Sequence, residues 1–307
     1  MKLSIIIPCF NCSFNIVNLL DSINSNHQHD FEIILINDGS SDNTEEVILK
    51  YKEASKKNIN LYSINNQGAA RARSYGLSKT QADYVFFCDS DDYLLPDSLD
   101  GILSSIDIEK PDILYFNSLI YDPINNTYNS KVNFINNNSY TNPDCFLMNQ
   151  LSKNNYTSAV WTYVFSTDLL KRSSAKFTER TAHEDHFFTL SLITHAKKIY
   201  CIARDVYVQK ITQGSLTNSE KDFLYLYSRL DAFFESNFLL KKETYSNSRG
   251  RYQYWSIKSF LNLAKCNKKS FFKLIFYPKF YGLLILNFTT ITSCLYFKFV
   301  KYIKGVA

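Results

Sequence analysis

Short apolar runs alternate with segments of helical apolar spacing along the first hundred residues. Four buried strands are predicted, at residues 4–8, 31–36, 60–64 and 84–88. Three helices are predicted between them, at residues 16–23, about 42–51 and 69–77. Strands that alternate with helices indicate βαβ units, so we expect an α/β fold with a mostly parallel sheet.

Two later segments depart from this pattern. Residues 117–155 are rich in Asn, Tyr and Ser, which predicts irregular loops that form a lid. From about residue 222 the pattern becomes helical and stays so. We therefore expect a domain at 1–221, with halves at about 1–115 and 116–221, and a helical region at 222–307.

The composition is that of a globular protein. The chain has 307 residues, of which 45% are hydrophobic, enough for a sizeable core. Its seven cysteines are odd in number and widely scattered, which is typical of a reducing cytosol. The first apolar run stops at Pro8, too early for a signal peptide, and is interpreted as a strand.

Charge is distributed unevenly along the chain. Residues 1–240 hold 21 Lys and Arg against 28 Asp and Glu, whereas residues 241–307 hold 13 against the single acid Glu243. Residues 280–297 carry no charge, but they include Asn, Thr and Ser and are slightly short for a membrane span. We expect interfacial helices on an anionic membrane surface; a buried core helix is the alternative. No RNA-binding motif accompanies the basic residues, so no nucleic acid is expected.

Acidic and polar turns follow several of the predicted strands. Asp89-Ser90-Asp91-Asp92 comes directly after an apolar strand, and oxygen ligands on such a loop suit Mg²⁺ or Mn²⁺. The alternative is a solvated turn in which Asp92 caps the next helix. Asp38, in a second acidic turn, can accept from a ring N–H such as that of uracil, or belong to an ordinary Asp-Gly turn.

Two further segments carry candidate chemistry. Residues 66–73 (Asn-Gln-Gly-Ala-Ala-Arg-Ala-Arg) open a helix with small residues, where a ligand phosphate can approach, and its arginines can neutralise carboxylates or form structural ion pairs. In His183-Glu184-Asp185-His186 the paired carboxylates could supply a general base, or could cap a helix. The histidines have no Cys or third His nearby, so zinc is not expected. Cys9-x-x-Cys12 has no second pair and is interpreted as a strand end.

The order of these motifs resembles family 2 glycosyltransferases. The resemblance rests on Ser4–Asn11 (Ser-Ile-Ile-Ile-Pro-Cys-Phe-Asn), on Ile36–Asp42, on Asn66-Gln-Gly with Ala72-Arg73, and on Phe87–Tyr93. Trp161, Glu184-Asp185 and Gly214-Ser-Leu-Thr217 extend it to about residue 220. Ser13 and Ser74 depart from the residues usual at their positions.

The resemblance implies a GT-A fold, a nucleotide-sugar donor, a Mn²⁺ or Mg²⁺ ion and inversion at the anomeric carbon. It also implies that residues 1–115 form the donor half and residues 116–221 the acceptor half. It implies that Asp185 is the base with Glu184 beside it, that Asp91 ligates the metal and that Trp161 shapes the acceptor side. The residues expected to bind the nucleotide-sugar are Pro8, Asn11, Asp38 (at the uracil), Gly68, Arg73, Asp89 and Ser90.

The sequence thus predicts a bacterial hexosyltransferase of surface-polysaccharide assembly. We expect a UDP-sugar donor, a lipid-linked (polyprenyl-diphosphate) saccharide acceptor, and a peripheral location on the inner face of the cytoplasmic membrane. A sugar-phosphate nucleotidyltransferase would carry a Gly-rich loop after the first strand, which this chain lacks. The remaining alternative is a nucleotide-sugar-binding or membrane scaffold whose transferase activity has decayed.

Overall fold

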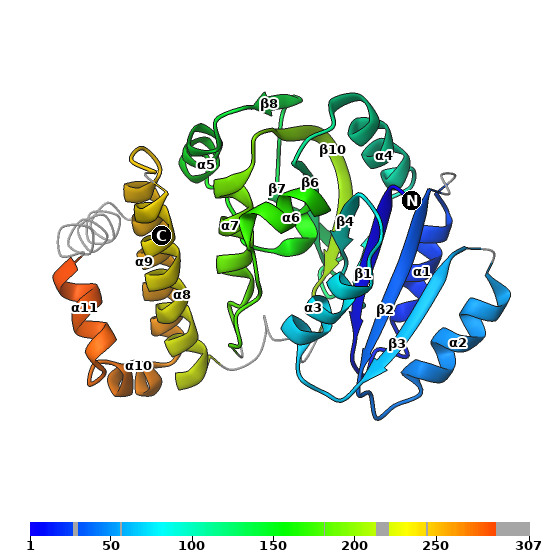
Figure 1. The fold of residues 1–307 in the computed structure, drawn as a ribbon. Helices are drawn as coiled ribbons and strands as arrows, with labels where there is room; N and C mark the ends of the chain where they lie inside the picture. The colour runs from blue at the N-terminus through cyan, green and yellow to red at the C-terminus, as the bar shows by residue number, and fades with distance from the viewer. Residues whose placement is uncertain (27–29, 56, 181, 213–220, 244, 287–307) are drawn as a thin grey trace.

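A mixed sheet forms the centre of the computed structural model, which describes residues 1–286 except 27–29, 56, 181, 213–220 and 244. Its strands run in the order β3-β2-β1-β4-β9-β6-β10-β5, with β7 beside β6 and β8 beside β10. Helices cover both faces, and a group of helices from the end of the chain stands at the side opposite β3 (Figure 1).

The N-terminal part has the alternation that the sequence predicts. Its parallel strands are β1 (Leu3–Cys9), β2 (Phe31–Asp38), β3 (Ile59–Ile64) and β4 (Tyr84–Phe87). Its helices are α1 (Ile16–Asn24), α2 (Thr44–Ala54), α3 (Ala69–Lys79) and α4 (Ser98–Glu109). Ile5 and Ile7 pack with α1 on one face and Ile6 with α3 on the other, which explains the continuous apolar run.

Small residues of α3 let this helix lie close to the sheet. A Cβ added at Gly76 would collide with the Ile6 side chain, so only glycine fits there without a shift of the helix. The close packing fixes the start of α3, which faces the carboxyl ends of β1 and β2.

The second half of the sheet is mainly antiparallel. Its remaining strands are β5 (Tyr93–Leu94), β6 (Ile113–Asp122), β7 (Thr127–Val132), β8 (Asn138–Tyr140), β9 (Tyr163–Ser166) and β10 (Ile199–Lys210). Strand β9 runs antiparallel to both β4 and β6, while β6 and β10 are parallel. Around β9 lie η1 (Val160–Thr162), α6 (Thr167–Ser173) and α7 (Asp185–His195).

The expectation of irregular loops at 117–155 is wrong. The segment holds the end of β6, all of β7 and β8, and helix α5 (Pro143–Ser152). Five of the six residues of β7 are exposed, so this strand has no apolar pattern and depends on its pairing with β6. Helix α5 begins at the cap Asn142, whose side chain accepts from the Asp144 and Cys145 N–H groups, a signal hidden in an Asn-rich stretch.

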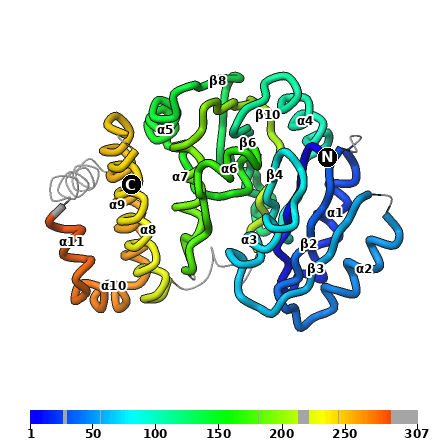
Figure 2. The backbone as a smooth tube through the Cα atoms, viewed as in Figure 1, coloured from blue at the N-terminus to red at the C-terminus, as the bar shows by residue number. Residues whose placement is uncertain are grey.

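The described part of the C-terminal region, up to residue 286, is helical, as expected. It consists of α8 (Phe223–Lys242), α9 (Arg249–Cys266), α10 (Lys268–Leu274) and α11 (Pro278–Leu286). Leu240 of α8 and Tyr252 of α9 belong to the same core cluster as Phe188 of α7. The tube view shows α8 beside α7 and α9 beside α8 (Figure 2). No helix among the described residues is long and apolar enough to cross a membrane. Most of the uncharged stretch at 280–297, and the Gly-Ser-Leu-Thr at 214–217, lie outside the described residues.

Candidate active site

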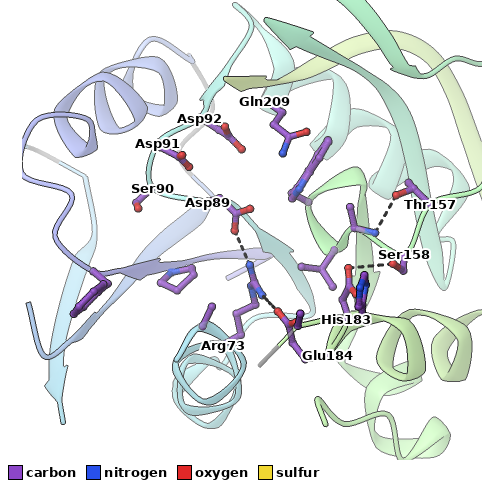
Figure 3. Close-up of a pocket in the computed structure, with 18 of the residues that line it drawn as sticks. Arg73, Asp89, Ser90, Asp91, Asp92, Thr157, Ser158, His183, Glu184 and Gln209 are labelled. Atoms are coloured by element: carbon purple, nitrogen blue, oxygen red, sulfur yellow. Dashed lines mark hydrogen bonds and ion pairs between the residues drawn. The ribbon is translucent and has the colours of Figure 1, made fainter. Parts of the chain in front are cut away.

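A cavity of about 480 Å³ opens at the carboxyl ends of β1 and β4. Residues from both halves of the sheet line it, including most of those expected from the sequence. On the donor side these are Pro8, Asp38, Arg73, Asp89, Ser90 and Asp91, and on the other side Trp161, Glu184 and Asp185. Figure 3 shows the aspartates of the 89–92 loop facing Thr157, Ser158 and His183 across this space.

Asp92 anchors the aspartate loop to β10. Its carboxylate accepts from the Tyr207 hydroxyl at 2.6 Å and from the Lys210 N–H at 2.8 Å, and only 2% of the residue is exposed. The Tyr207 hydroxyl in turn accepts from the Asp89 N–H at 2.9 Å. Asp92 therefore does not cap the next helix, α4, whose cap residue is Asp97.

Asp91 presents a carboxylate to the cavity. The Thr212 hydroxyl donates to its Oδ2. Burial raises the pKa of Asp91, and the hydrogen bond from Thr212 opposes this rise. A cation bound beside Asp91 would lower the pKa further and so favour the charged carboxylate. No group of three or more metal-ligating side chains occurs among the described residues. The Asp91 carboxylate offers the oxygen atoms that Mg²⁺ and Mn²⁺ prefer, alongside substrate phosphates and water.

Arg73 connects the two sides of the cavity. Its guanidinium donates to Asp89 Oδ1 at 2.7 Å and to Glu184 Oε1 at 3.2 Å, as Figure 3 shows. Burial alone would lower the pKa of Arg73, but Asp89 and Glu184 raise it, so the side chain stays charged. The neighbouring arginine, Arg71, forms an exposed ion pair with Glu179.

Asp38 and Asn11 form hydrogen bonds with backbone N–H groups of neighbouring loops. The Asp38 carboxylate accepts from the Gln67 N–H at 2.9 Å and the Gly68 N–H at 2.8 Å, which holds the loop before α3. Asn11 accepts from the Ser41 N–H at 2.8 Å. Neither Asn11 nor Gly68 lines the cavity, whereas Asp38 does. Contact of Asn11 and Gly68 with a nucleotide-sugar stays a prediction.

Asp185 begins helix α7 inside the cavity wall. The Ser158 hydroxyl donates to its Oδ2 at 3.1 Å. Burial raises the pKa of Asp185 to about 7, and the neighbouring Glu184 charge adds to the rise, while Arg73 and Ser158 oppose it. A carboxylate that titrates near neutral pH is well matched to proton abstraction from a hydroxyl.

His183 and His186 stand on either side of this pair as neutral groups. Burial lowers the pKa of His183 to about 3 and also lowers that of His186, and the charge of Arg229 acts in the same direction. Their rings lie 5.4 Å apart, and among the described residues no third ligand completes a metal group. Both histidines line the cavity.

Several residues of the site could not be identified from the sequence. Tyr207 lies in the buried run Val206–Val208 of β10, and nothing local shows that its hydroxyl joins Asp89 and Asp92 or that its ring stacks on Trp161 at 4.8 Å. Ser158 and Lys131 also line the cavity. Tyr207 on β10 and Lys131 on β7 reach the site through strand pairing, and Ser158 lies in the segment between α5 and η1, so no motif marks them.

Solved structures share this fold. The structure of Staphylococcus aureus TarS 1–349 in complex with UDP-GlcNAc superimposes with a TM-score of 0.68 at 22% identity, over 86% of this chain and 72% of that one. The mannosyltransferase PcManGT from Pyrobaculum calidifontis, in complex with GDP-Man and Mn²⁺, gives 0.54 at 14% identity, over 96% and 86%. The fold is therefore GT-A, with the candidate site at the carboxyl ends of its strands.

The sequence comparisons define the family. Residues 4–175 match the model of Glycosyl transferase family 2, which is more than half of the chain, so the protein belongs to this glycosyltransferase family. The glycosyltransferase YibD of Escherichia coli is 26% identical over 91% of this chain and 75% of its own length. The poly(ribitol-phosphate) β-N-acetylglucosaminyltransferase TarS of S. aureus is 27% identical over 67% of this chain, which spans only 35% of that relative.

Proposed function

We propose that this protein is an inverting glycosyltransferase that moves a hexose from a UDP-sugar to a hydroxyl of a lipid-linked saccharide. Its pathway would be O-antigen, capsule or lipopolysaccharide assembly. The observation that carries the proposal is a single cavity lined by Asp91 in the donor half and by Asp185 in the acceptor half. TarS 1–349 of S. aureus has been solved in complex with UDP and with UDP-GlcNAc, which supports a UDP-sugar donor for this chain.

The donor would lie over the carboxyl ends of β1, β2 and β4. In this placement the uracil contacts Asp38, the nucleoside lies against Pro8, and the diphosphate lies by Asp89 and Ser90. Asp91 would hold Mn²⁺ or Mg²⁺, which neutralises charge on the diphosphate when bound. The oxygen of Asp91 is a suitable ligand for either ion.

Asp185 would act as the general base. The acceptor hydroxyl gives its proton to the Asp185 carboxylate while its oxygen forms a bond to the anomeric carbon. The bond from that carbon to the phosphate oxygen breaks, and UDP leaves from the opposite face, which inverts the configuration. General-base catalysis of this kind typically contributes about 10²–10⁴-fold in rate.

Trp161 would shape the acceptor side. Its ring is only 5% exposed and is fixed by the stack on Tyr207, so it forms a rigid wall between the aspartate loop and Ser158. A rigid wall limits the orientations in which the acceptor hydroxyl can approach the donor.

The C-terminal helices would rest on an anionic membrane surface from the cytoplasmic side. Helices α10 and α11 and the residues between them expose Phe272, Phe276 and Tyr281 among Lys268, Lys269 and Lys273. Exposed aromatic and basic residues together favour binding to anionic headgroups. If the full-length protein does not bind anionic liposomes at low salt, this part of the proposal is contradicted.

The test is UDP release from a panel of UDP-sugars, measured with lipid-linked saccharide acceptors. Asp185→Asn should lower kcat by at least about 10²-fold because the base is lost. Asp168→Asn is the matched control, since Asp168 is exposed on α6 and pairs only with Arg172 among the described residues. Full activity of the Asp185 variant would exclude it as the base.

A further inference from the structure

A second cavity, of about 710 Å³, lies between the end of α5 and one face of α9. Asn154 lines it from the first side, and Arg251, Tyr254, Trp255 and Lys258 line it from the second. We call it the α9 groove. Its size is that of a small-ligand site.

The α9 groove is basic. Arg251 and Lys258 are exposed, and no ion pair to either occurs among the described residues. Helix α9 carries no acidic residue, and residues 241–307 hold only Glu243. The groove therefore offers two cationic side chains to an anionic ligand, and no acidic residue of its lining competes with that ligand for them.

Aromatic rings form part of the groove wall and are rigidly held. Tyr254 and Trp255 are both partly exposed. The Trp255 ring lies 4.8 Å from Tyr156 in an edge-on contact and 5.5 Å from Tyr252, with the Arg229 guanidinium 5.2 Å from it. A fixed, half-exposed indole supplies a flat apolar face, against which the C–H face of a sugar ring can pack at little entropic cost.

One short strip of chain separates the α9 groove from the active-site cavity. Asn154 lines the groove, while Thr157 and Ser158 line the cavity and Ser158 holds Asp185. Three residues span at most about 11 Å even when fully extended. Between them Tyr156 contacts Trp255, and the Trp255 ring also lies 5.9 Å, centroid to centroid, from the ring of His186 in the cavity wall.

We propose that the α9 groove binds an anionic saccharide segment of the acceptor, whose reacting hydroxyl lies at Asp185. Arg251 and Lys258 pair with its phosphate or carboxylate groups, and Trp255 and Tyr254 pack against its sugar rings. This inference rests on the proposed function and extends it, because it gives the acceptor a negative charge at a distance of a few sugars from the reacting end.

Fluorine NMR of the full chain labelled with 5-fluorotryptophan tests the inference. The chain has two tryptophans, so Trp255 reports on the groove and Trp161 on the active-site cavity, and Trp255→Phe assigns the signals. The probes are phosphorylated maltotriose, a hyaluronan tetrasaccharide, unmodified maltotriose, inorganic phosphate and phosphatidylglycerol vesicles. The inference predicts that the first two shift the Trp255 signal at millimolar concentration and that the other three do not.

Variants separate the groove from general attraction of anions. Arg251→Ala with Lys258→Ala should weaken this binding by about tenfold or more, because both charge-assisted contacts are lost. The matched control is Lys171→Ala with Lys265→Ala, two exposed lysines outside the groove, which should bind as the wild type does.

Four outcomes with the saccharide, phosphate and vesicle probes overturn the inference. No Trp255 shift with either anionic saccharide excludes the site, and an equal shift with unmodified maltotriose excludes the anionic class. A shift with phosphate alone indicates a lone anion site, and one with vesicles indicates a lipid-facing surface. UDP with Mg²⁺ should shift Trp161 in the same sample; loss of that response alone would contradict the proposed function and leave the groove as a saccharide site.

Discussion

Arg73 and Glu184 form an ion pair of 3.2 Å between side chains that are 111 residues apart in the chain. Through its second Nη atom Arg73 also holds Asp89. Helix α3 thus connects the aspartate loop of the donor half to the residue beside Asp185. The single positive charge of Arg73 offsets part of the negative charge of these two carboxylates, which in the proposed function weakens their repulsion of the donor diphosphate.

Replacement of Arg73 by Met should cost stability as well as activity. It leaves Asp89 and Glu184 without their cation, and because both side chains keep some solvent contact (28% and 17% exposed) we expect a loss of about 2–3 kcal/mol in the free energy of unfolding. Urea denaturation measures it. Arg71→Met is the control: it removes an exposed pair and should cost under about 1 kcal/mol. Equal losses in the two variants would contradict this role of Arg73.

The pH dependence of kcat/KM should follow Asp185. The base acts only when deprotonated, so the rate should rise with pH and reach half its maximum near pH 7, where the pKa of Asp185 lies. Glu184→Gln should move this limb to lower pH, because the Glu184 charge contributes to the raised pKa. A flat profile between about pH 5 and 8 would show that no such base limits the rate.

Asp185→Asn should stabilise the protein at high pH while it abolishes activity. A carboxylate whose pKa rises from 3.8 to about 7 on folding binds its proton more tightly in the folded state, so ionisation costs stability as pH rises through this window. The neutral amide avoids that cost, by up to about 4 kcal/mol above pH 7 and by almost nothing near pH 4. Melting temperatures at the two pH values test this, and a difference that is the same at both would refute it.

Tyr207→Phe should loosen the aspartate loop. The hydroxyl donates to Asp92 and accepts from the Asp89 N–H. Its loss leaves both buried groups without this hydrogen-bond partner, which should lower the free energy of unfolding by about 1–3 kcal/mol. Nucleotide affinity should fall with it, whereas the stack on Trp161 survives in phenylalanine. Tyr128→Phe, at an exposed tyrosine that bonds Tyr93, is the control and should leave affinity unchanged.

The donor half could be predicted from the sequence because its signals are local. The run that ends at Pro8, the turn at Asp38 and the aspartates at 89–92 each mark the end of a buried strand, and parallel strands bring such ends together. In the structure Arg73, Asp89 and Asp185 line one cavity, and their roles in binding and catalysis stay predictions.

The acceptor half could not be predicted in the same way. Strand β7 pairs with β6 but exposes five of its six residues. Because it buries no alternate side chains, its sequence lacks the period-two apolar pattern of a half-buried strand. Ser158 and Tyr207 reach Asp185 and Asp92 from segments 27 and 115 residues away. Contacts at such separation depend on the sheet order, which a single sequence does not define.

The proposed function requires metal-dependent binding of a uridine nucleotide beside Asp91. Calorimetry of the purified protein with UDP, GDP, CDP and ADP, with and without Mn²⁺, tests it most directly, with Asp91→Ala as the variant and Asp97→Ala, in the turn before α4, as the control. We predict UDP binding that requires a divalent ion, Mn²⁺ or Mg²⁺, in the wild type and in the control and is lost in the Asp91 variant. Absence of nucleotide binding with any metal, or UDP binding that Asp91→Ala leaves unchanged, would contradict the account.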